Sequence, residues 1–465
     1  MKHTKNIFIS FIYILLISCS SNPRIKDPLN NSAPIKNVLF ISFCSVNTHF
    51  LPTYSTNIEE KNYPNLSAFF NSSFNFINAF NDVSWSNAKR FIFFKEWSKL
   101  YGINNRRVEP IQDWKEDGIN ISYIHIPAHK DLKNQYNDYF DDRRLEVTSK
   151  NFDTIINEVT KRNQNPDSKN IWMLHFKLMH YPYLSETYLN NPEFLYSNFT
   201  TKELSLINEY IEHPEKYPEK LSFFQVVFGK DNFKNLFIKN NQFRNYATDL
   251  RSVERWRKSK NYETDYSILK KSYKLRLKDL DKLVGKIREY YSQHLEKDTA
   301  LIIGGDHGES LYEHNYLSHG TIPYDEAIHF FYSVHFPHQS IKSIINNQYG
   351  QRSLTKIIES IPLGNTNQKN FLSSLHANRE DENIISFSCT GDIASIRYDN
   401  TWKLIYYLKE EKYQLFNLKN DPDEKIDLAD NQEQLVTELK IKILEKISFL
   451  YTSPGECVWP LILWK

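Results

Sequence analysis

Residues 300–321 read ALIIGGDHGESLYEHNYLSHGT, an apolar run that ends in a dense set of Asp, His and Glu side chains. Such a run is typical of a strand buried on both faces of a parallel sheet. Asp and His are also common metal ligands in proteins. We therefore expect a buried strand that delivers Asp306 and His307 to a functional site at its carboxyl end.

Two other segments repeat the pattern, residues 36–47 (KNVLFISFCSVN) and residues 170–180 (NIWMLHFKLMH). Residues 273–295, just before the last of the three strands, carry apolar residues at helical spacing, and we also expect helices over 208–224 and 235–250. Strands that alternate with helices predict an α/β fold with a mostly parallel central sheet flanked by helices. Ligands bind such sheets beyond the carboxyl ends of the strands. Those ends are Phe43-Cys44, His175 to His180, and Asp306-His307.

The C-terminal part has a different pattern. Residues 393–424 alternate apolar and polar residues between turn signals, which predicts a small antiparallel sheet, and residues 433–451 predict a closing amphipathic helix. We therefore expect a large α/β domain over 37–375, with a helical insertion at about 185–295, and a C-terminal subdomain over 376–465.

The N-terminus has the features of an export signal. Basic residues precede a short apolar run that ends in LISC, residues 16–19, and a polar segment follows. This resembles a bacterial lipoprotein signal over residues 1–19, with lipid on Cys19 and a flexible tether over 20–36. The alternative is an ordinary secretory signal with a chance cysteine. Under either interpretation the mature chain is exported, and the lipoprotein interpretation anchors it in the bacterial cell envelope, facing the periplasm or the exterior.

Composition and cysteine count bear on the class of protein, on binding to nucleic acid and on disulfide pairing. The chain has 465 residues, 15% aromatic residues and a net charge of +2, so it is a folding sequence with no strongly basic block for nucleic acid. Besides Cys19 the chain has Cys44, Cys389 and Cys457. Cys389 and Cys457 could form a disulfide. Because these three cysteines are an odd number, at least one thiol stays free or pairs with another molecule.

Four blocks, in order, resemble the sulfatase family of the alkaline phosphatase superfamily. They are NVLFISFCSVNTHFLPTYS with YPNLSAFF, FINAFNDVSWSNAKR, HFKLMHYPY, and DHGESLYEHNYLSHGT. The later YQLFNLKNDPDEKIDLA also resembles the family's C-terminal ending. The matches cover most of residues 37–430 except the helical insertion. The resemblance implies the sulfatase fold and cleavage or transfer of sulfate or phosphate esters.

The nucleophile of the family stands in a (C/S)-x-(P/A)-x-R pattern. Here the pattern reads Ser86-Asn87-Ala88-Lys89-Arg90. The resemblance implies that Ser86 is converted to formylglycine, as in sulfatases, or attacks directly, as in phosphotransferase relatives. Arg90 would then orient the nucleophile or screen charge. The alternative is a surface loop with an incidental Ser and Arg.

Asp306 and His307 match the family's second metal pair. Imidazole is a good ligand for zinc and a poor one for calcium, so zinc is favoured and calcium is the alternative. His180 and His319 fall where the family places cationic groups on the anionic oxygens of the substrate. The charge of His319, which stands where many sulfatases have Lys, would depend on pH.

The chain departs from the family at Cys44, where the first strand usually ends in an acidic metal ligand. His49 and Lys95-Glu96 are further departures. In one interpretation Cys44, Ser86, Asp306 and His307 make a four-ligand zinc site, because thiolate, imidazole and carboxylate are all zinc donors. In the other, Cys44 is an inert buried residue and the protein is degenerate.

We favour retained chemistry, because Ser86, Arg90, His180, Asp306, His307, Glu309 and His319 occur together. The predicted function is metal-assisted hydrolysis or transfer of a sulfate or phosphate ester of an anionic small molecule or glycan, with Ser86 or its formylglycine derivative attacking. The competing hypothesis is a lipid-tethered protein that binds an anionic ligand without turnover.

Overall fold

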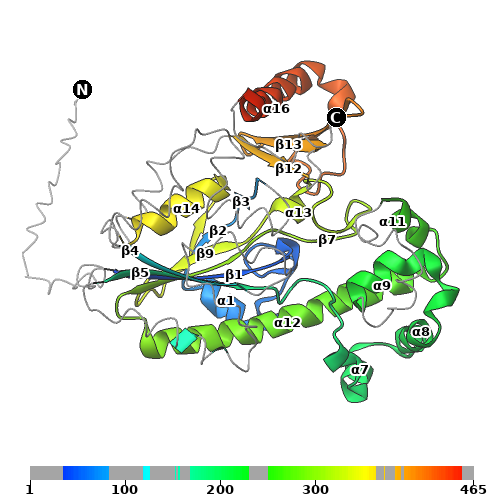
Figure 1. Ribbon diagram of the computed structural model, residues 1–465, viewed down its shortest axis with the longest axis horizontal. Coiled ribbons are helices and arrows are strands. Elements are labelled where there is room, and N and C mark those ends of the chain that lie inside the picture. The colour runs from blue at the N-terminus through cyan, green and yellow to red at the C-terminus, as the bar shows by residue number, and fades with distance from the viewer. Residues whose placement is uncertain are drawn as a thin grey trace, which may run out of the picture. The chain divides into compact units, whose positions relative to one another are not determined.

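A seven-stranded sheet organises the part of the chain that the structure, a computed structural model, describes. The described residues are 35–82, 119–125, 152, 156–157, 168–229, 250–362, 371, 383–388 and 392–452. The strand order is β10-β2-β9-β6-β1-β5-β4. Every neighbouring pair is parallel except those that β9 makes with β2 and β6 (Figure 1). The predicted mostly parallel sheet is therefore confirmed.

The strands of this sheet are β1 (Asn37–Phe43), β2 (Phe74–Phe76), β4 (Ile119–His125), β5 (Lys169–Phe176), β6 (Thr299–Gly305), β9 (Tyr332–His335) and β10 (Ser343–Ile345). Two short pairs accompany it: β3 (Ala79–Phe80) with β11 (Tyr349–Gly350), and β7 (Ser310–Leu311) with β8 (Leu317–Ser318). A separate antiparallel sheet consists of β12 (Asn383–Phe387), β13 (Ile393–Tyr398), β14 (Trp402–Tyr407) and β15 (Lys412–Asn417). It confirms the small C-terminal sheet that the sequence predicts.

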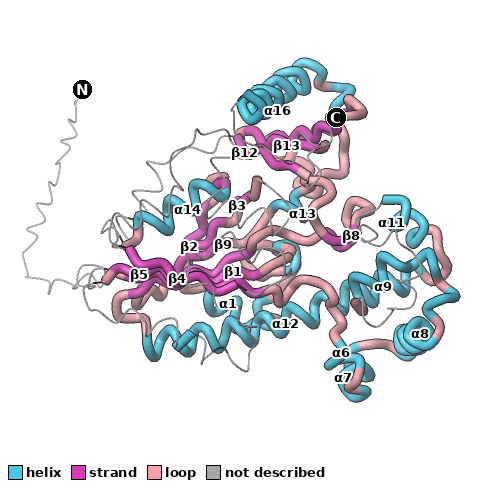
Figure 2. Tube along the Cα trace, viewed as in Figure 1, coloured by secondary structure: helices cyan, strands magenta, loops and turns pink. Residues whose placement is uncertain are grey.

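The described helices are α1 (Pro64–Phe70), α6 (Glu186–Leu189), α7 (Pro192–Asn198), α8 (Thr201–Glu212), α9 (Leu221–Val227), α11 (Leu250–Arg257), α12 (Tyr262–His294), α13 (Asp325–Ile328), α14 (Gln351–Ser360) and α16 (Glu433–Thr452). Figure 2 shows that α6, α7, α8, α9 and α11 gather at one end of α12 and that α16 lies on the C-terminal sheet. None of the described helices combines the length and apolar character needed to cross a bilayer.

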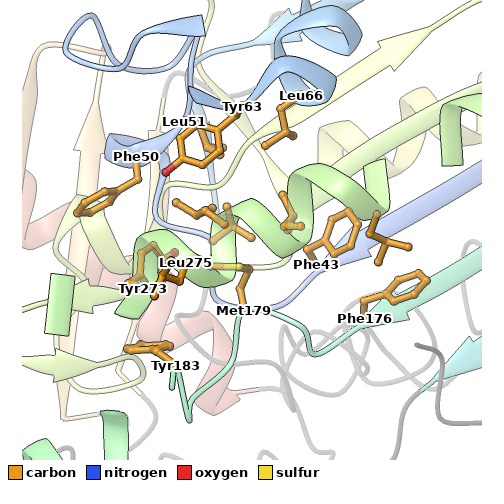
Figure 3. Close-up of a cluster of buried hydrophobic side chains, with 14 of the residues drawn as sticks. Phe43, Phe50, Leu51, Tyr63, Leu66, Phe176, Met179, Tyr183, Tyr273 and Leu275 are labelled. Carbon is orange, nitrogen blue, oxygen red and sulfur yellow. The ribbon is translucent and has the colours of Figure 1, made fainter. Parts of the chain in front are cut away.

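Alternating side chains of the central strands pack into two separate cores. Leu39 and Ile41 of β1 belong to the larger core, which also contains residues of α1 and α12. Val38 and Phe40 belong to the second core, on the face covered by α14. Successive side chains of a strand point to opposite faces, so a strand covered on both sides must be apolar throughout. This explains why these strands read as continuous apolar runs. Figure 3 shows part of the larger core, including Phe43 and its neighbour Phe176.

The helix expected over 208–224 is interrupted in the structure. Helix α8 ends at Glu212, and α9 begins only at Leu221. Between them Pro214 and Pro218 each open a 3-10 turn. Proline cannot donate a backbone hydrogen bond and clashes with the preceding turn of a helix, so the prediction of one helix was wrong. Most of the other expected helix, 235–250, lies outside the described residues, as do residues 1–34. The domain boundaries given above stay predictions.

Buried charges join the antiparallel sheet to the α/β part. Arg397 of β13 and Lys403 of β14 both contact Asp325 of α13, with 2.7 Å between the Lys403 Nζ and Asp325 Oδ1 atoms. Lys403 also lies 2.6 Å from a carboxylate oxygen of Glu424. The two cations hold the pKa of the buried Asp325 carboxyl well below its usual range, although burial alone would raise it. A buried charge left without its counter-charge is costly in free energy. Separating the two parts would break these buried ion pairs, so the ion pairs hold the parts together.

His314, between β7 and β8, makes a second connection to the C-terminal part. Its Nδ1 lies 2.7 Å from the Glu326 carboxylate, and its Nε2 lies 3.0 and 3.1 Å from the carbonyl oxygens of Asp423 and Glu424. Both ring nitrogens therefore face acceptors, which only the doubly protonated ring can satisfy. Burial lowers the pKa of His314, but the hydrogen bond and charge of Glu326 outweigh it and raise the pKa to about 9.

We predict that His314→Gln destabilises the protein in a pH-dependent way. Because the folded-state pKa is raised from 6.5 to about 9, the stabilisation is complete below pH 6.5 and is lost as the pH rises through about 9. The shift corresponds to a free energy on the order of 3 kcal/mol. Chemical denaturation of wild type and variant should show a difference in the free energy of unfolding that is large near neutral pH and shrinks in alkali. A difference that does not change with pH would contradict the imidazolium assignment.

Candidate functional site

Three strand ends meet at one edge of the central sheet. Strand β1 lies between β5 and β6, and the register places Phe43 opposite both Phe176 and Gly305. Immediately beyond, the Asp306 backbone N–H donates to the Phe43 carbonyl at 2.9 Å, and the Cys44 N–H donates to the Phe176 carbonyl at 2.9 Å. Segments that are far apart in the sequence therefore arrive side by side, as expected for the carboxyl ends of parallel strands.

Backbone groups hold the Asp306 carboxylate in place. Its Oδ1 accepts from the backbone N–H groups of Ser45 at 3.1 Å and His307 at 2.8 Å. Its Oδ2 lies 3.7 Å from Nε2 of His175. The Asn81 side-chain amide donates to the Asp306 carbonyl at 3.1 Å. The carboxylate is buried, and its orientation is set by dipoles that cannot move without disturbing the sheet.

The Cys44 thiol lies against the imidazole of His307. The Cys44 Sγ atom is 3.7 Å from His307 Nε2, and both residues are fully buried. On the other side of the ring, His307 Nδ1 is 2.7 Å from the Gly308 carbonyl oxygen. A carbonyl can only accept, so Nδ1 carries the hydrogen and Nε2 presents a lone pair toward Cys44. This places Cys44, Asp306 and His307, the predicted metal residues, next to one another.

His175 joins this group, although sequence reasoning did not single it out as a ligand. One ligand atom each from Cys44, His175 and Asp306 lie within 4.8 Å of one another, and all three residues are buried. Nδ1 of His175 lies 2.7 Å from the Ser42 hydroxyl oxygen. The sequence did place His175 at a strand end. Only the register of β5 on β1 shows which face it occupies.

A second cluster lies beside the first and contains His319. Its Nδ1 is 2.6 Å from Oε2 of Glu309, and the Tyr183 hydroxyl donates to Oε1 of the same carboxylate. His307, Glu309 and His319 offer ligand atoms within 4.8 Å of one another. The Glu309 carboxylate therefore fixes the tautomer of His319, with Nδ1 protonated and Nε2 left to meet a ligand. Neither Glu309 as an orienting group nor Tyr183 was predicted. Nothing in the sequence around Tyr183 or around Glu309 indicates that these two residues are in contact.

His180 completes the predicted anion-contacting pair with His319. The two ring centroids are 5.2 Å apart, and His180 Nδ1 lies 3.1 Å from the Tyr181 carbonyl. Burial, with a smaller contribution from the charge of His319, lowers the pKa of His180 to about 3. The imidazole is therefore neutral near pH 7 before an anion enters. The resemblance to the sulfatase family, by contrast, implies a cationic group at this position.

A tyrosine of the longest described helix supports the loop after β1. The Tyr273 hydroxyl of α12 accepts from the Asn47 backbone N–H at 2.7 Å and donates to the Ser45 carbonyl at 2.9 Å. Its ring is fully buried and lies edge-on to Tyr183 at 5.1 Å (Figure 3). The helix thus satisfies two backbone groups directly behind the metal-ligand candidates.

Other predicted residues lie outside the described part of the chain. They are Ser86, Arg90, Cys19, Cys389 and Cys457, together with Lys95-Glu96. The roles assigned to these residues stay predictions.

The fold is the one that sulfatases have. No protein-family model and no curated protein matches the sequence. A protein solved with its substrate D-glucosamine-2-N,6-O-disulfate is 12% identical, with a TM-score of 0.58 over 90% of this chain and 99% of that chain. A 2-O GAG sulfatase is 12% identical, with a TM-score of 0.57 over 90% of this chain and 93% of its own.

A related hydrolase shares the same architecture. The phosphonate monoester hydrolase of Agrobacterium radiobacter is 13% identical, with a TM-score of 0.58 over 89% of this chain and 96% of its own. The chain therefore has the sulfatase and alkaline phosphatase fold, which confirms the predicted resemblance at the level of the fold.

We predict that Tyr273→Phe destabilises the protein without changing its fold. Losing the hydroxyl leaves the buried Asn47 N–H and Ser45 carbonyl without this partner, at a cost of about 1–3 kcal/mol for each group. Tyr332→Phe is a matched control, because within the described residues the buried Tyr332 hydroxyl makes no hydrogen bond. Urea denaturation should show a much smaller free-energy change for the control. Equal losses would contradict the assigned role of the Tyr273 hydroxyl.

Proposed function

We propose that the protein is a hydrolase or transferase of sulfate or phosphate esters. The observation that carries the proposal is the meeting of Cys44, Asp306 and His307 with His180 and His319 beyond the strand ends. Nucleophilic displacement at sulfur or phosphorus needs groups that stabilise negative charge and a group that protonates the leaving oxygen. The imidazoles can protonate the leaving oxygen, and the carboxylate, imidazole and thiolate could hold a metal that would stabilise the negative charge.

In this proposal the Ser86 hydroxyl, or a hydroxyl of its hydrated formylglycine derivative, attacks the sulfur or phosphorus atom and forms an ester with it, while the bond to the leaving alcohol breaks. Water or an acceptor alcohol then takes the sulfate or phosphate group from the enzyme. Arg90 orients the nucleophile or screens its charge. His319, oriented by Glu309, and His180 contact the anionic oxygens or deliver the proton to the leaving alcohol. A neutral His180 can donate from only one ring nitrogen, and Nδ1 lies by the Tyr181 carbonyl. Its contact with the anion therefore requires that it gain a proton when the anion binds.

The donor atoms suit zinc better than calcium. Calcium takes six to eight oxygen ligands, whereas zinc is held by thiolate, imidazole and carboxylate. Cys44, His307 and Asp306 offer one donor of each of these three kinds. They would hold the metal, which supplies Lewis-acid stabilisation of charge when bound.

We further propose that the substrate is an anionic small molecule or glycan ester. Support comes from the similarly folded protein solved with a sulfated glucosamine substrate and from one solved with a carrageenan oligosaccharide. We also propose that lipid on Cys19 holds the protein on the bacterial cell envelope. Such an anchor would restrict the enzyme to substrates that reach the membrane surface.

A binding protein without turnover is the second candidate function. The observation that favours it is the thiol of Cys44 at the end of β1, where the family's pattern has an acid. A thiol carries negative charge only when deprotonated, so the metal could be held less strongly and the anion bound without attack.

We predict that Ser86→Ala abolishes turnover and keeps metal binding. Hydrolysis of aryl sulfate and aryl phosphate esters should fall by at least about 10³-fold, because the nucleophile is removed. Metal content after purification should remain about one equivalent. Ser292→Ala, on the exposed surface of α12, is the matched control and should behave as wild type.

Two outcomes separate the candidate functions. Equal, measurable turnover by wild type and Ser86→Ala would show that Ser86 is not the nucleophile. If both proteins are inert and free of metal, the binding function replaces the enzyme. Mass spectrometry of the peptide that contains Ser86 distinguishes serine from formylglycine, since the aldehyde has fewer hydrogens.

A further inference from the structure

We propose that His175 is a metal ligand and that Cys44, His175, Asp306 and His307 together form a four-donor zinc site. This deepens the proposed function, on which it rests for the choice of metal. It replaces the predicted ligand set, in which Ser86 was the fourth ligand. Ser86 is then left to act as a nucleophile, and the metal is held entirely by residues at the ends of three neighbouring strands.

The distances between donor atoms support the proposal. His307 Nε2 is 3.7 Å from Cys44 Sγ and 3.6 Å from Asp306 Oδ1, and His175 Nε2 is 3.7 Å from Asp306 Oδ2. A tetrahedral zinc ion with Zn–N of about 2.0–2.1 Å and Zn–S of about 2.3 Å places its donors about 3.3–3.6 Å apart. These three distances exceed that range by at most a few tenths of an ångström. The His175 donor atom lies within 4.8 Å of the Cys44 donor atom, so rotation of the His175 side chain would have to bring its ring closer to the other donors.

The hydrogen bonds behind the two imidazoles also suit metal binding. A ligating histidine usually donates its other ring N–H to an oxygen, which fixes the tautomer and the ring plane. His307 Nδ1 has the Gly308 carbonyl at 2.7 Å, and His175 Nδ1 has the Ser42 hydroxyl at 2.7 Å. In both residues Nε2 is the nitrogen that faces the Asp306 carboxylate. The rings of His175 and His307 are therefore oriented in the same way, each with Nε2 toward one oxygen of the Asp306 carboxylate.

Charge balance points to the same metal. A Cys44 thiolate and the Asp306 carboxylate supply two negative charges, and two neutral imidazoles supply none, which matches a divalent cation. All four side chains are buried, where charge is costly, so a divalent cation would stabilise the charged forms of Cys44 and Asp306. Asp306 is the one carboxylate in the set, which is too few oxygen donors for calcium.

The test measures metal binding directly. Metal-free protein is titrated with zinc(II) and cobalt(II), and binding is followed by elemental analysis and by the thiolate-to-cobalt charge-transfer absorption. We expect one equivalent for wild type and for Ser86→Ala. His175→Ala should weaken binding by at least about 100-fold and Ser42→Ala by about tenfold, and Cys44→Ser should abolish the charge-transfer absorption. His338→Ala, a substitution of a largely exposed histidine, is the matched control.

Several outcomes would overturn the proposal. They are unchanged zinc affinity in His175→Ala, cobalt absorption without a thiolate band in wild type, and loss of the metal in Ser86→Ala. Circular dichroism and thermal unfolding of the metal-free variants show whether each folds, and His175→Gln provides a second substitution if His175→Ala does not. Zinc bound through these residues without any ester turnover would support this site and refute the hydrolase. Turnover that requires calcium and is unaffected by His175→Ala would refute the site and leave the hydrolase.

Discussion

The hydrogen-bonded register of three parallel strands is the constraint on which the site depends. Strand β1 pairs with β5 on one side and β6 on the other, over seven residues in each case. The ladder continues for one more bond on each side, from Cys44 N–H and from Asp306 N–H. A slip by one residue would turn every side chain to the opposite face. It would therefore separate the Cys44 thiol from the His307 imidazole and also break up both apolar cores.

The polar side chains at the strand ends are buried and therefore require hydrogen-bond or ionic partners. Cys44, His175, Asp306, His307 and Glu309 are buried, so each of their polar side chains must find a partner in the protein or in a ligand. Backbone N–H groups hold Asp306, and a carbonyl holds His307. The outer cluster depends on side chains instead, since Tyr183 and His319 share the Glu309 carboxylate. The inner cluster is thus held mainly by backbone groups and the outer one mainly by side chains.

The replacement of a strand-end acid by cysteine changes the chemistry without emptying the site. A thiolate supplies one negative charge and a soft donor, and histidines from two strands lie within reach of the same carboxylate. Such a set prefers zinc over a cation that needs many oxygens. His175 and His307 lie beside the same carboxylate as Cys44, which is why we propose an altered metal site here and not a degenerate one.

The sequence by itself determined the three central strands, the small C-terminal sheet and their order along the chain. The apolar runs predict β1, β5 and β6, the alternation after residue 393 predicts the small sheet, and the order of blocks predicts the family fold. It also placed Cys44, Asp306 and His307 at strand ends, because those positions follow directly from where the apolar residues stop. Local composition and periodicity carry this information, since burial on one or both faces dictates side-chain polarity along a segment.

Only the tertiary structure decided which polar residues share a face and contact one another. His175 meets Asp306 and Tyr183 meets Glu309 across gaps of more than one hundred residues, and Tyr273 reaches back from α12 to Ser45 and Asn47. These contacts depend on strand register and on helix placement over the sheet. Both come from packing summed over many distant side chains, which no single segment encodes. The prolines that break the expected helix at 208–224 are, by contrast, a local signal. Their positions in the sequence are sufficient to predict the break.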